Sequence, residues 1–193
     1  VWTVADAVST NAKIRVLDAD ATHPLTEAIS PAFTIQGALI LTAPAGSENL
    51  AVNGSTTITW TKSTSIASVN LLYSTNDFAT STPIASGVAG TSFAWTVPDA
   101  ISSNVKVKVV DADATHPPKE HISPAFTIKG GLVVTAPTAG QILTKDGSTN
   151  ITWVTTGTIG QVSLYYSKDN FTTQTLITAV PIANTGSYTW TVP

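Results

Sequence analysis

The sequence contains neither cysteine nor methionine, and it has few charged residues. The absence of cysteine excludes disulfides, thiolate metal sites and cysteine nucleophiles. Asp, Glu, Lys and Arg make up 11% of the 193 residues, against ~25% in a typical soluble domain. A net charge of −3 and the lack of a basic patch argue against nucleic-acid binding. No run of 18 apolar residues is present, so we expect no membrane insertion by this segment.

Hydroxyl side chains take the place of charges on the expected surface. The chain has 33 Thr and 18 Ser, together about a quarter of its residues. It is also 42% hydrophobic and has five Trp, which is enough to build a buried core and excludes a disordered chain. This composition is typical of exported proteins and predicts an extracellular, cell-surface β-protein.

Internal repetition organises the chain. Residues 1–37 recur as 94–130, with 25 of 37 positions identical at a constant offset of 93. Residues 38–130 recur in part as 131–193, and the offset there grows from 93 to 95 through a short insertion. The sequence therefore predicts three segments: the C-terminal part of one repeat (1–37), one complete repeat (38–130) and the N-terminal part of another (131–193).

Apolar and polar residues alternate through most of the complete repeat, which is typical of half-buried strands. Ile58 and Trp60, for example, share one face, while Thr57 and Thr59 share the other. Strands are expected at 38–44, 56–62, 68–74, 82–86, 92–97, 104–111 and 123–129. Seven short strands with one apolar face each pack as two facing sheets. The predicted fold class is therefore all-β: tandem immunoglobulin-like seven-strand sandwiches of about 93–95 residues, joined end to end, with Trp60 and Trp95 between the sheets.

The order of motifs carries a resemblance to a known family. The third segment has Gly147, Ser148, Ile151, Thr152, Trp153, Val162, Leu164, Tyr166 and Ser167, followed by Gly186 through Pro193. This pattern resembles the serine/threonine-rich, GPI-anchored family named for fungal cell-wall beta-glucan assembly proteins, and similar repeats of prokaryotic surface proteins. The complete repeat departs from the pattern at 91–94. The resemblance implies an extracellular surface or matrix module with no catalytic residues to carry over.

The junctions between segments are short. One strand ends at Lys129, and only Gly130 and Gly131 separate it from the next apolar run; Gln36-Gly37-Ala38 is equally tight. A flexible tether needs many Gly and Ser residues, so consecutive repeats are expected to stack with restricted bend and twist. The expected object is a stiff rod.

Two explanations account for the partial repeats. The chain is either a window of a longer array, or separate subunits complete each other head to tail. Residues 1–5 resemble residues 189–193, so in the second case each joint would carry the same strand twice. That redundancy favours the first explanation. In both, the partners are identical repeats or subunits, with cell-wall or surface glycans as further candidates.

The motif DADATHP occurs twice, at 18–24 and 111–117, and is the strongest candidate for a metal site. Alternate residues of an extended segment point the same way, so each copy presents two carboxylates on one face. The candidate calcium ligands are Asp18, Asp20 and Glu27 in the first copy and Asp111, Asp113 and Glu120 in the second. The simpler interpretation is that these Asp residues accept turn hydrogen bonds. We expect turn or structural roles for His23, His116 and His121, and no certain cofactor.

Other candidate binding features are weaker. No Ser-His-Asp arrangement or carboxylate-lined cleft is expected, so the chain is not predicted to be an enzyme. Leu72 and Tyr165 fall opposite the apolar face, where they would form a carbohydrate platform or a lateral contact. Asn53, Asn150 and Asn170 lie in sequons for N-glycosylation.

Three functions fit these observations. The first is a structural repeat of an extracellular filament, stalk or surface layer. The second is an adhesin or carbohydrate-binding module, and the third is a spacer in a larger secreted enzyme. The near-identity of 1–37 and 94–130 favours the first, since binding loops are expected to diverge whereas a polymer needs similar joints.

Overall fold

The computed structural model describes all 193 residues, and the chain consists of strands, turns and loops. The prediction of an all-β fold is confirmed. An apolar helix with the length needed to span a bilayer is not found in the structure. Contacts group the chain into two compact units, Val1–Glu48 with Ser55–Trp95 and Ser103–Phe126, and Asn49–Gly54 with Thr96–Ser102 and Thr127–Pro193. The division into three repeat segments stays a prediction.

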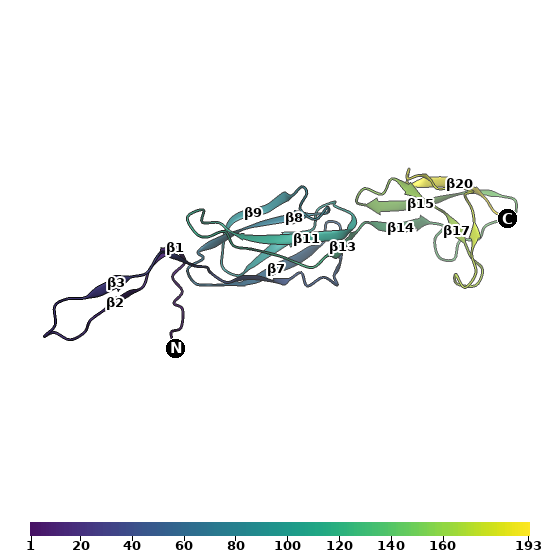
Figure 1. Cartoon of the computed structure of the whole chain (residues 1–193). Helices are drawn as coiled ribbons and strands as arrows, with labels where there is room; N and C mark the ends of the chain where they lie inside the picture. The colour runs from purple at the N-terminus through teal and green to yellow at the C-terminus, as the bar shows by residue number, and fades with distance from the viewer. The chain divides into compact units, whose positions relative to one another are not determined.

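The complete repeat contains all seven predicted strands and two short ones that were not predicted. The seven are β5 (Leu39–Ala43), β7 (Ser55–Lys62), β8 (Ser68–Ser74), β9 (Thr82–Ala89), β10 (Ser92–Thr96), β11 (Ser102–Asp111) and β13 (Phe126–Lys129). The additional strands are β6 (Asn49–Ala51), which pairs in parallel with β13, and β12 (Glu120–Ile122), which pairs with β11. One sheet has the order β10-β7-β5 and the other β6-β13-β11-β8-β9. Figure 1 labels β7 of the first sheet and β13, β11, β8 and β9 of the second.

The core of this repeat follows the predicted alternation. Trp60 and Trp95 are both buried, as predicted. The Trp95 ring meets Phe126 edge-on at 6.4 Å and Tyr73 at 5.7 Å between ring centroids. Because Trp95 belongs to the three-stranded sheet and its two partners to the other, these contacts join the two layers of a sandwich.

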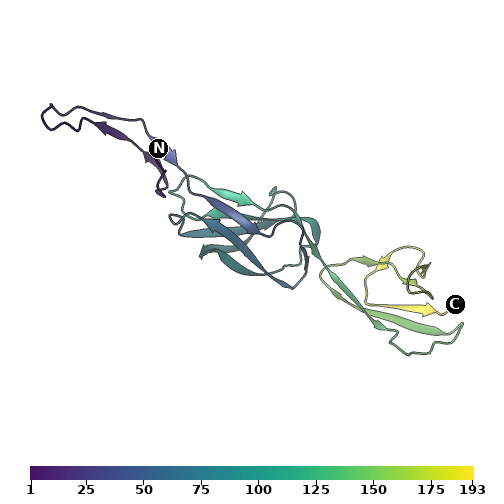
Figure 2. The same cartoon turned by 90° about the horizontal axis from the view of Figure 1, so that it is seen from below.

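Residues 1–37 form four short strands. These are β1 (Ser9–Ala12), β2 (Arg15–Leu17), β3 (Glu27–Ile29) and β4 (Phe33–Ile35). β1 pairs with β4 and β2 pairs with β3, both antiparallel. Figures 1 and 2 show β2 and β3 as a two-stranded ribbon with no second layer against it.

Residues 131–193 form a three-stranded sheet and two small pairs. The sheet has the order β14 (Gly131–Ala136), β15 (Ser148–Thr156) and β20 (Ser187–Thr191). The pairs are β16 (Gln161–Val162) with β19 (Ile182–Ala183), and β17 (Tyr165–Tyr166) with β18 (Thr175–Leu176). Its buried core is limited to Ile151, Trp153 and Val162.

Candidate functional site

The first candidate site surrounds the junction between residues 1–37 and the complete repeat. The carboxylate of Asp6 accepts hydrogen bonds from the hydroxyl groups of Thr64 and Ser65, and from the Ser65 backbone N–H at 3.1 Å. These hydroxyl bonds, chiefly that from Ser65, lower the pKa of Asp6 to about 2. One acidic side chain thus ties the loop before β1 to the loop between β7 and β8.

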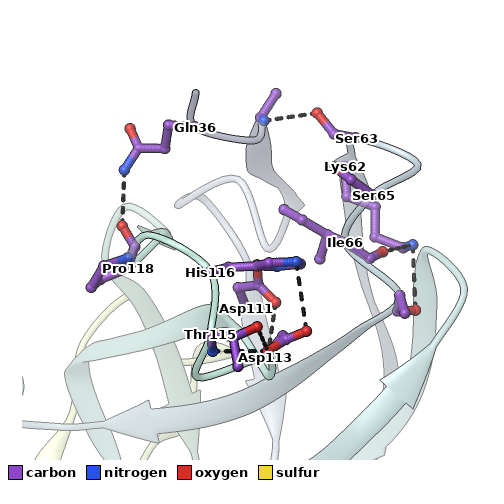
Figure 3. A network of polar contacts seen from close by, with 12 residues as sticks. Gln36, Lys62, Ser63, Ser65, Ile66, Asp111, Asp113, Thr115, His116 and Pro118 are labelled. Carbon is purple, nitrogen blue, oxygen red and sulfur yellow. Dashed lines mark hydrogen bonds and ion pairs between the residues drawn. The ribbon is translucent and has the colours of Figure 1, made fainter. Parts of the chain in front are cut away.

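A glycine allows close approach at the same junction. A Cβ at Gly37 would lie 3.0 Å from Ile66 Cδ1 and 3.1 Å from Val8 Cγ2, so these side chains pack directly on the backbone. Further bonds fix the neighbouring residues: Ala38 N–H donates to Ser63 Oγ at 2.9 Å, and Gln36 Nε2 donates to the Pro118 carbonyl at 2.9 Å (Figure 3).

The junction at Gly130 repeats this arrangement. The Thr158 hydroxyl donates to Asp99 at 2.5 Å, and this bond lowers the pKa of Asp99. A Cβ at Gly130 would lie 2.9 Å from Ile101 Cδ1 and 2.9 Å from Ile159 Cδ1. An acid–hydroxyl bond and an apolar contact onto a glycine therefore occur together again.

The two junctions use the same positions of the repeat. At the offset of 93, Asp6, Val8, Gly37, Ser65 and Ile66 correspond to Asp99, Ile101, Gly130, Thr158 and Ile159. We call these two sets the joint residues. The glycines were recognised in the sequence as marking tight junctions, but the two Asp residues were missed. The signal that could have found them is an Asp retained at the offset of 93, with a hydroxyl residue retained at the position it contacts.

The DADATHP loop at 111–117 forms a turn closed by a histidine. Asp111 Oδ2 lies 2.7 Å from His116 Nδ1, and Asp113 Oδ2 lies 3.6 Å from His116 Nε2 (Figure 3). The hydrogen bond with Asp111 raises the pKa of His116. The hydroxyl and backbone N–H of Thr115 donate to Asp113 at 2.6 and 2.8 Å, and they lower its pKa.

The predicted glutamate ligands form ion pairs with basic side chains. Glu120 pairs with Lys108 at 3.2 Å, and Glu27 pairs with Arg15 at 3.6 Å. No group of three or more His, Cys, Asp or Glu side chains is arranged to hold a metal ion. The oxygens of Asp18 and Asp20 accept backbone N–H bonds within the turn, as in the second copy. Calcium binding stays a prediction.

The remaining candidate residues are spread over the surface. The side chains of Asn53, Asn150 and Asn170 are exposed, and glycosylation there stays a prediction. Tyr165 is exposed, whereas its counterpart Leu72 is half-buried. The two repeats therefore do not share an aromatic platform at this position.

The third segment exposes residues whose counterparts form the core of the complete repeat. Leu132 is 52% exposed and Val134 65% exposed, whereas Leu39 and Leu41 at the same positions are 1% and 7% exposed. An apolar hollow of about 140 Å³ lies beside these residues and is also lined by Val162. A second hollow of about 430 Å³ extends past Val134 along the segment. We call this surface the open face of 131–193.

Residues 1–37 expose the complementary part of the core. Val16 is 67% exposed, whereas Val109 at the same position is 0% exposed. Ile14 is likewise exposed, and its counterpart Val107 is buried. The same sequence pattern is thus buried in the complete repeat and exposed in residues 1–37.

Comparison with known proteins gives a weak likeness to solved structures. No family model and no curated protein match the chain. Among solved structures, it is similar to a chain from "Structures of Clostridium thermocellum CbhA fibronectin(III)-like modules". The two are 17% identical, the match covers 81% of this chain and 80% of the other, and the TM-score is 0.34. No functional argument follows from a likeness of this size, so the assignment of a β-sandwich depends on the sheets and core described above.

Proposed function

We propose that this chain is a structural segment of an extracellular filament, stalk or surface layer, in which sandwich repeats follow one another through short, closely similar joints. The observation that carries the proposal is the recurrence of the joint residues at both junctions. Asp6 and Asp99 each accept a hydrogen bond from a hydroxyl group in the following repeat. The side chain of an isoleucine in that repeat packs against the backbone of Gly37 at one junction and of Gly130 at the other. A module selected for binding a ligand has no need to preserve such junctions.

The joint contacts give a physical reason for stiffness. The linker has no spare residues, so it cannot act as a flexible tether. The charge-assisted hydrogen bond that the Ser65 N–H donates to Asp6 lies at the same junction as the apolar contact of Ile66 with Gly37. Bending the junction would therefore break the hydrogen bond or separate the apolar contact. Restricted bend and twist at every junction would produce a rod.

The surface chemistry supports a non-catalytic, exported role. The chain is poor in charge and rich in Thr and Ser, and the two DADATHP loops adopt the same turn with the same acceptors. An adhesin, a carbohydrate-binding module and a spacer in a larger secreted enzyme are the alternatives. An adhesin or carbohydrate-binding module would require an exposed aromatic stripe or a loop that differs between repeats, whereas a spacer would belong to a secreted enzyme whose active domain lies elsewhere.

The joint can be tested with spin labels, because the chain has no cysteine of its own. Thr34→Cys and Ser81→Cys place one label on each side of the Gly37 junction, and pulsed dipolar spectroscopy measures the distance distribution. We expect a narrow distribution that broadens in Asp6→Ala. Asp146→Ala, which removes an exposed Asp paired only with its neighbour Lys145, is the matched control and should change nothing. A broad distribution in the unmodified joint would overturn the proposal.

Calcium at the Asp111–Asp113 loop has a separate test. If the ion bridges the loop to the junction, a chelator should increase the flexibility of the chain without unfolding it, because the core is complete without metal. Small-angle scattering with and without chelator measures this. An unchanged maximum dimension would favour the turn interpretation.

A further inference from the structure

We propose that the open face of 131–193 takes up residues 6–37 of a second copy of this chain, so that two incomplete repeats form one complete sandwich. The proposal rests on the proposed function, because it names the partner along the filament, and it takes up the second explanation of the partial repeats, in which subunits complete each other head to tail. The complete repeat of the same chain is the template: there, 38–98 and 99–130 are already packed together.

The two segments together supply each position of the repeat once. Residues 131–193 correspond to 38–98, and residues 6–37 correspond to 99–130. Residues 1–5 match 189–193, which β20 and its flanking residues already provide. The second copy would therefore contribute from Asp6 onwards, and its first five residues would remain outside the sandwich.

The strands of 131–193 are interrupted where their partners are absent. In the complete repeat β8 is continuous over seven residues and pairs with β11. Its counterpart, 161–167, is reduced to β16 and β17, with Ser163 and Leu164 outside any strand. Likewise β6 pairs with β13, whereas 142–144 form no strand. Both interruptions fall on strands whose partners correspond to residues of 1–37.

Residues 6–37 show the converse pattern. β11 is a single strand of ten residues, but its counterpart, 9–18, is divided into β1 and β2. The ribbon itself is already formed, since Val16 pairs with Ala28 as Val109 pairs with His121. Little further ordering is needed on binding, which favours association.

The template fixes the register of the contact. β11 pairs Val107 with Tyr73 and Val109 with Leu71. The same register places Ile14 opposite Tyr166, Val16 opposite Leu164 and Asp18 opposite Val162. The exposed side chains of Ile14 and Val16 would then cover the hollow that Val162 and Leu164 line. Two surfaces that are each exposed alone would become one core.

The residue types for a cation–aromatic contact are also present at the corresponding positions of the two segments. In the complete repeat Lys108 Nζ lies 4.6 Å from the centroid of the Phe78 ring. The same positions are occupied by Arg15 and Phe171, and Phe171 is exposed in the free chain. Binding of the β2–β3 ribbon of the second copy would place Arg15 over the Phe171 ring.

One hydrogen bond of the complete repeat has no acceptor at the corresponding position of residues 6–37. Supplying that acceptor should strengthen the association. Leu41 N–H donates to His121 Nδ1 at 3.2 Å, but residue 28 at the His121 position is Ala. The backbone N–H of Val134 would therefore lack this acceptor. Ala28→His should restore the bond and tighten association about tenfold, the equivalent of about 1.4 kcal/mol.

Sedimentation of the full chain over a range of concentrations tests the association. We expect oligomers that grow with concentration, and Val16→Asp should weaken association at least roughly a hundredfold because it would bury an unpaired carboxylate. Val16 is exposed in the free chain, so this variant should fold normally. Trp2→Asp is the matched control, because Trp2 is also an exposed apolar residue. It lies outside the proposed contact, so this variant should associate as the unmodified chain does.

A chain that stays monomeric at all concentrations, or equal effects of Val16→Asp and Trp2→Asp, would overturn this proposal. Neither result would affect the rod proposal, because the spin-label measurement at Gly37 is made within one molecule. A monomer with a rigid joint would leave the proposed function standing without a second copy.

Disulfide trapping tests the register. Leu17 and Ser163 correspond to Val110 and Asn70, which lie directly opposite in β11 and β8. Mixing Leu17→Cys chains with Ser163→Cys chains under mild oxidation should give a crosslinked dimer of two different molecules. Tyr165→Cys is the control partner, because a shift of two residues, roughly 6.6 Å along the strand, places its Cα too far away to bridge. Equal trapping of both pairs would contradict the proposed register.

Discussion

Residues 9–18 and 102–111 have closely similar sequences but adopt different structures. The second is one continuous strand, β11, with β8 along one edge. The first is divided into β1 and β2, and β2 is exposed along its whole length. The turn that follows is nevertheless the same in both, since Asp18 N–H donates to the Thr26 carbonyl as Asp111 N–H donates to Lys119.

This comparison separates local from long-range effects. The ribbon of β2 and β3 and its turn form without a neighbouring strand, so local hydrogen bonds and turn residues are sufficient for them. The continuity of β11 and the burial of its valines require the opposite sheet and β8. Loss of a neighbour thus shortens strands more readily than it changes register.

The largest effect is expected in the core. Trp60→Ala should lower the free energy of unfolding of the complete repeat by about 3–5 kcal/mol, because a buried ring is replaced by a cavity. Trp2→Ala removes an exposed ring and should change it by less than about 0.5 kcal/mol. Chemical denaturation of both variants measures the difference, and similar losses would contradict the burial of Trp60.

The two joint glycines should differ in their tolerance of a side chain. A Cβ at Gly130 would lie 2.8 Å from the backbone oxygen of Thr156, whereas at Gly37 the nearest atom is the end of the flexible Ile66 side chain. Gly130→Ala should therefore cost about 1–3 kcal/mol and Gly37→Ala less. Gly160→Ala, where nothing lies within 4 Å, is the control. Thermal unfolding of the three variants would show whether this order holds.

Acid should weaken the Asp6 contact. The pKa of Asp6 is lowered from 3.8 to about 2 in the folded chain, so its stabilising contribution is present above pH 3.8 and is lost as the pH falls towards 2. The spin-label distribution across the Gly37 junction should broaden over this range. In Asp6→Asn it should be broad already at neutral pH and change little with acid. A distribution that is insensitive to pH in the unmodified chain would show that the carboxylate is not what holds the joint.

The smallest expected effect is the pH-dependent contribution of His116 to stability. Its pKa is raised above 6.5 by the hydrogen bond with Asp111, so its contribution is fully present below pH 6.5 and is lost as the pH rises through the folded pKa. Titration of its ring resonances by NMR should give a midpoint above 6.5 that returns to the ordinary value in Asp111→Asn. A midpoint at or below 6.5 in the unmodified chain would argue against the Asp111 contact.

Most of the complete repeat could be predicted from the sequence, because alternation of apolar residues marks strands that have one buried face. β6 was missed because Asn49–Ala51 is short and has a single large apolar residue, so its pairing depends on the distant β13. β12 was missed for a similar reason, since Glu120–Ile122 carries no alternating pattern.

The joint was predicted only in part. The short linker at Gly130 was visible in the sequence, but Asp99 lay in a loop where an acidic residue has many possible roles. Only the structure brings the Thr158 hydroxyl to it. Likewise the ion pairs of Glu27 and Glu120 depend on cross-strand neighbours, so the sequence alone could not separate these residues from the Asp pairs.

The ribbon of β2 and β3, which keeps its pairing without a second layer, has a consequence for the order of folding. Leu17 pairs with Glu27 only ten positions along the chain, so little loop-closure entropy opposes the contact. The matching ribbon of β11 and β12 should therefore form early in the complete repeat and serve as the surface on which β8 later docks. Substitutions within the turn at 111–117 should then slow refolding, whereas substitutions in β5 should mainly speed unfolding.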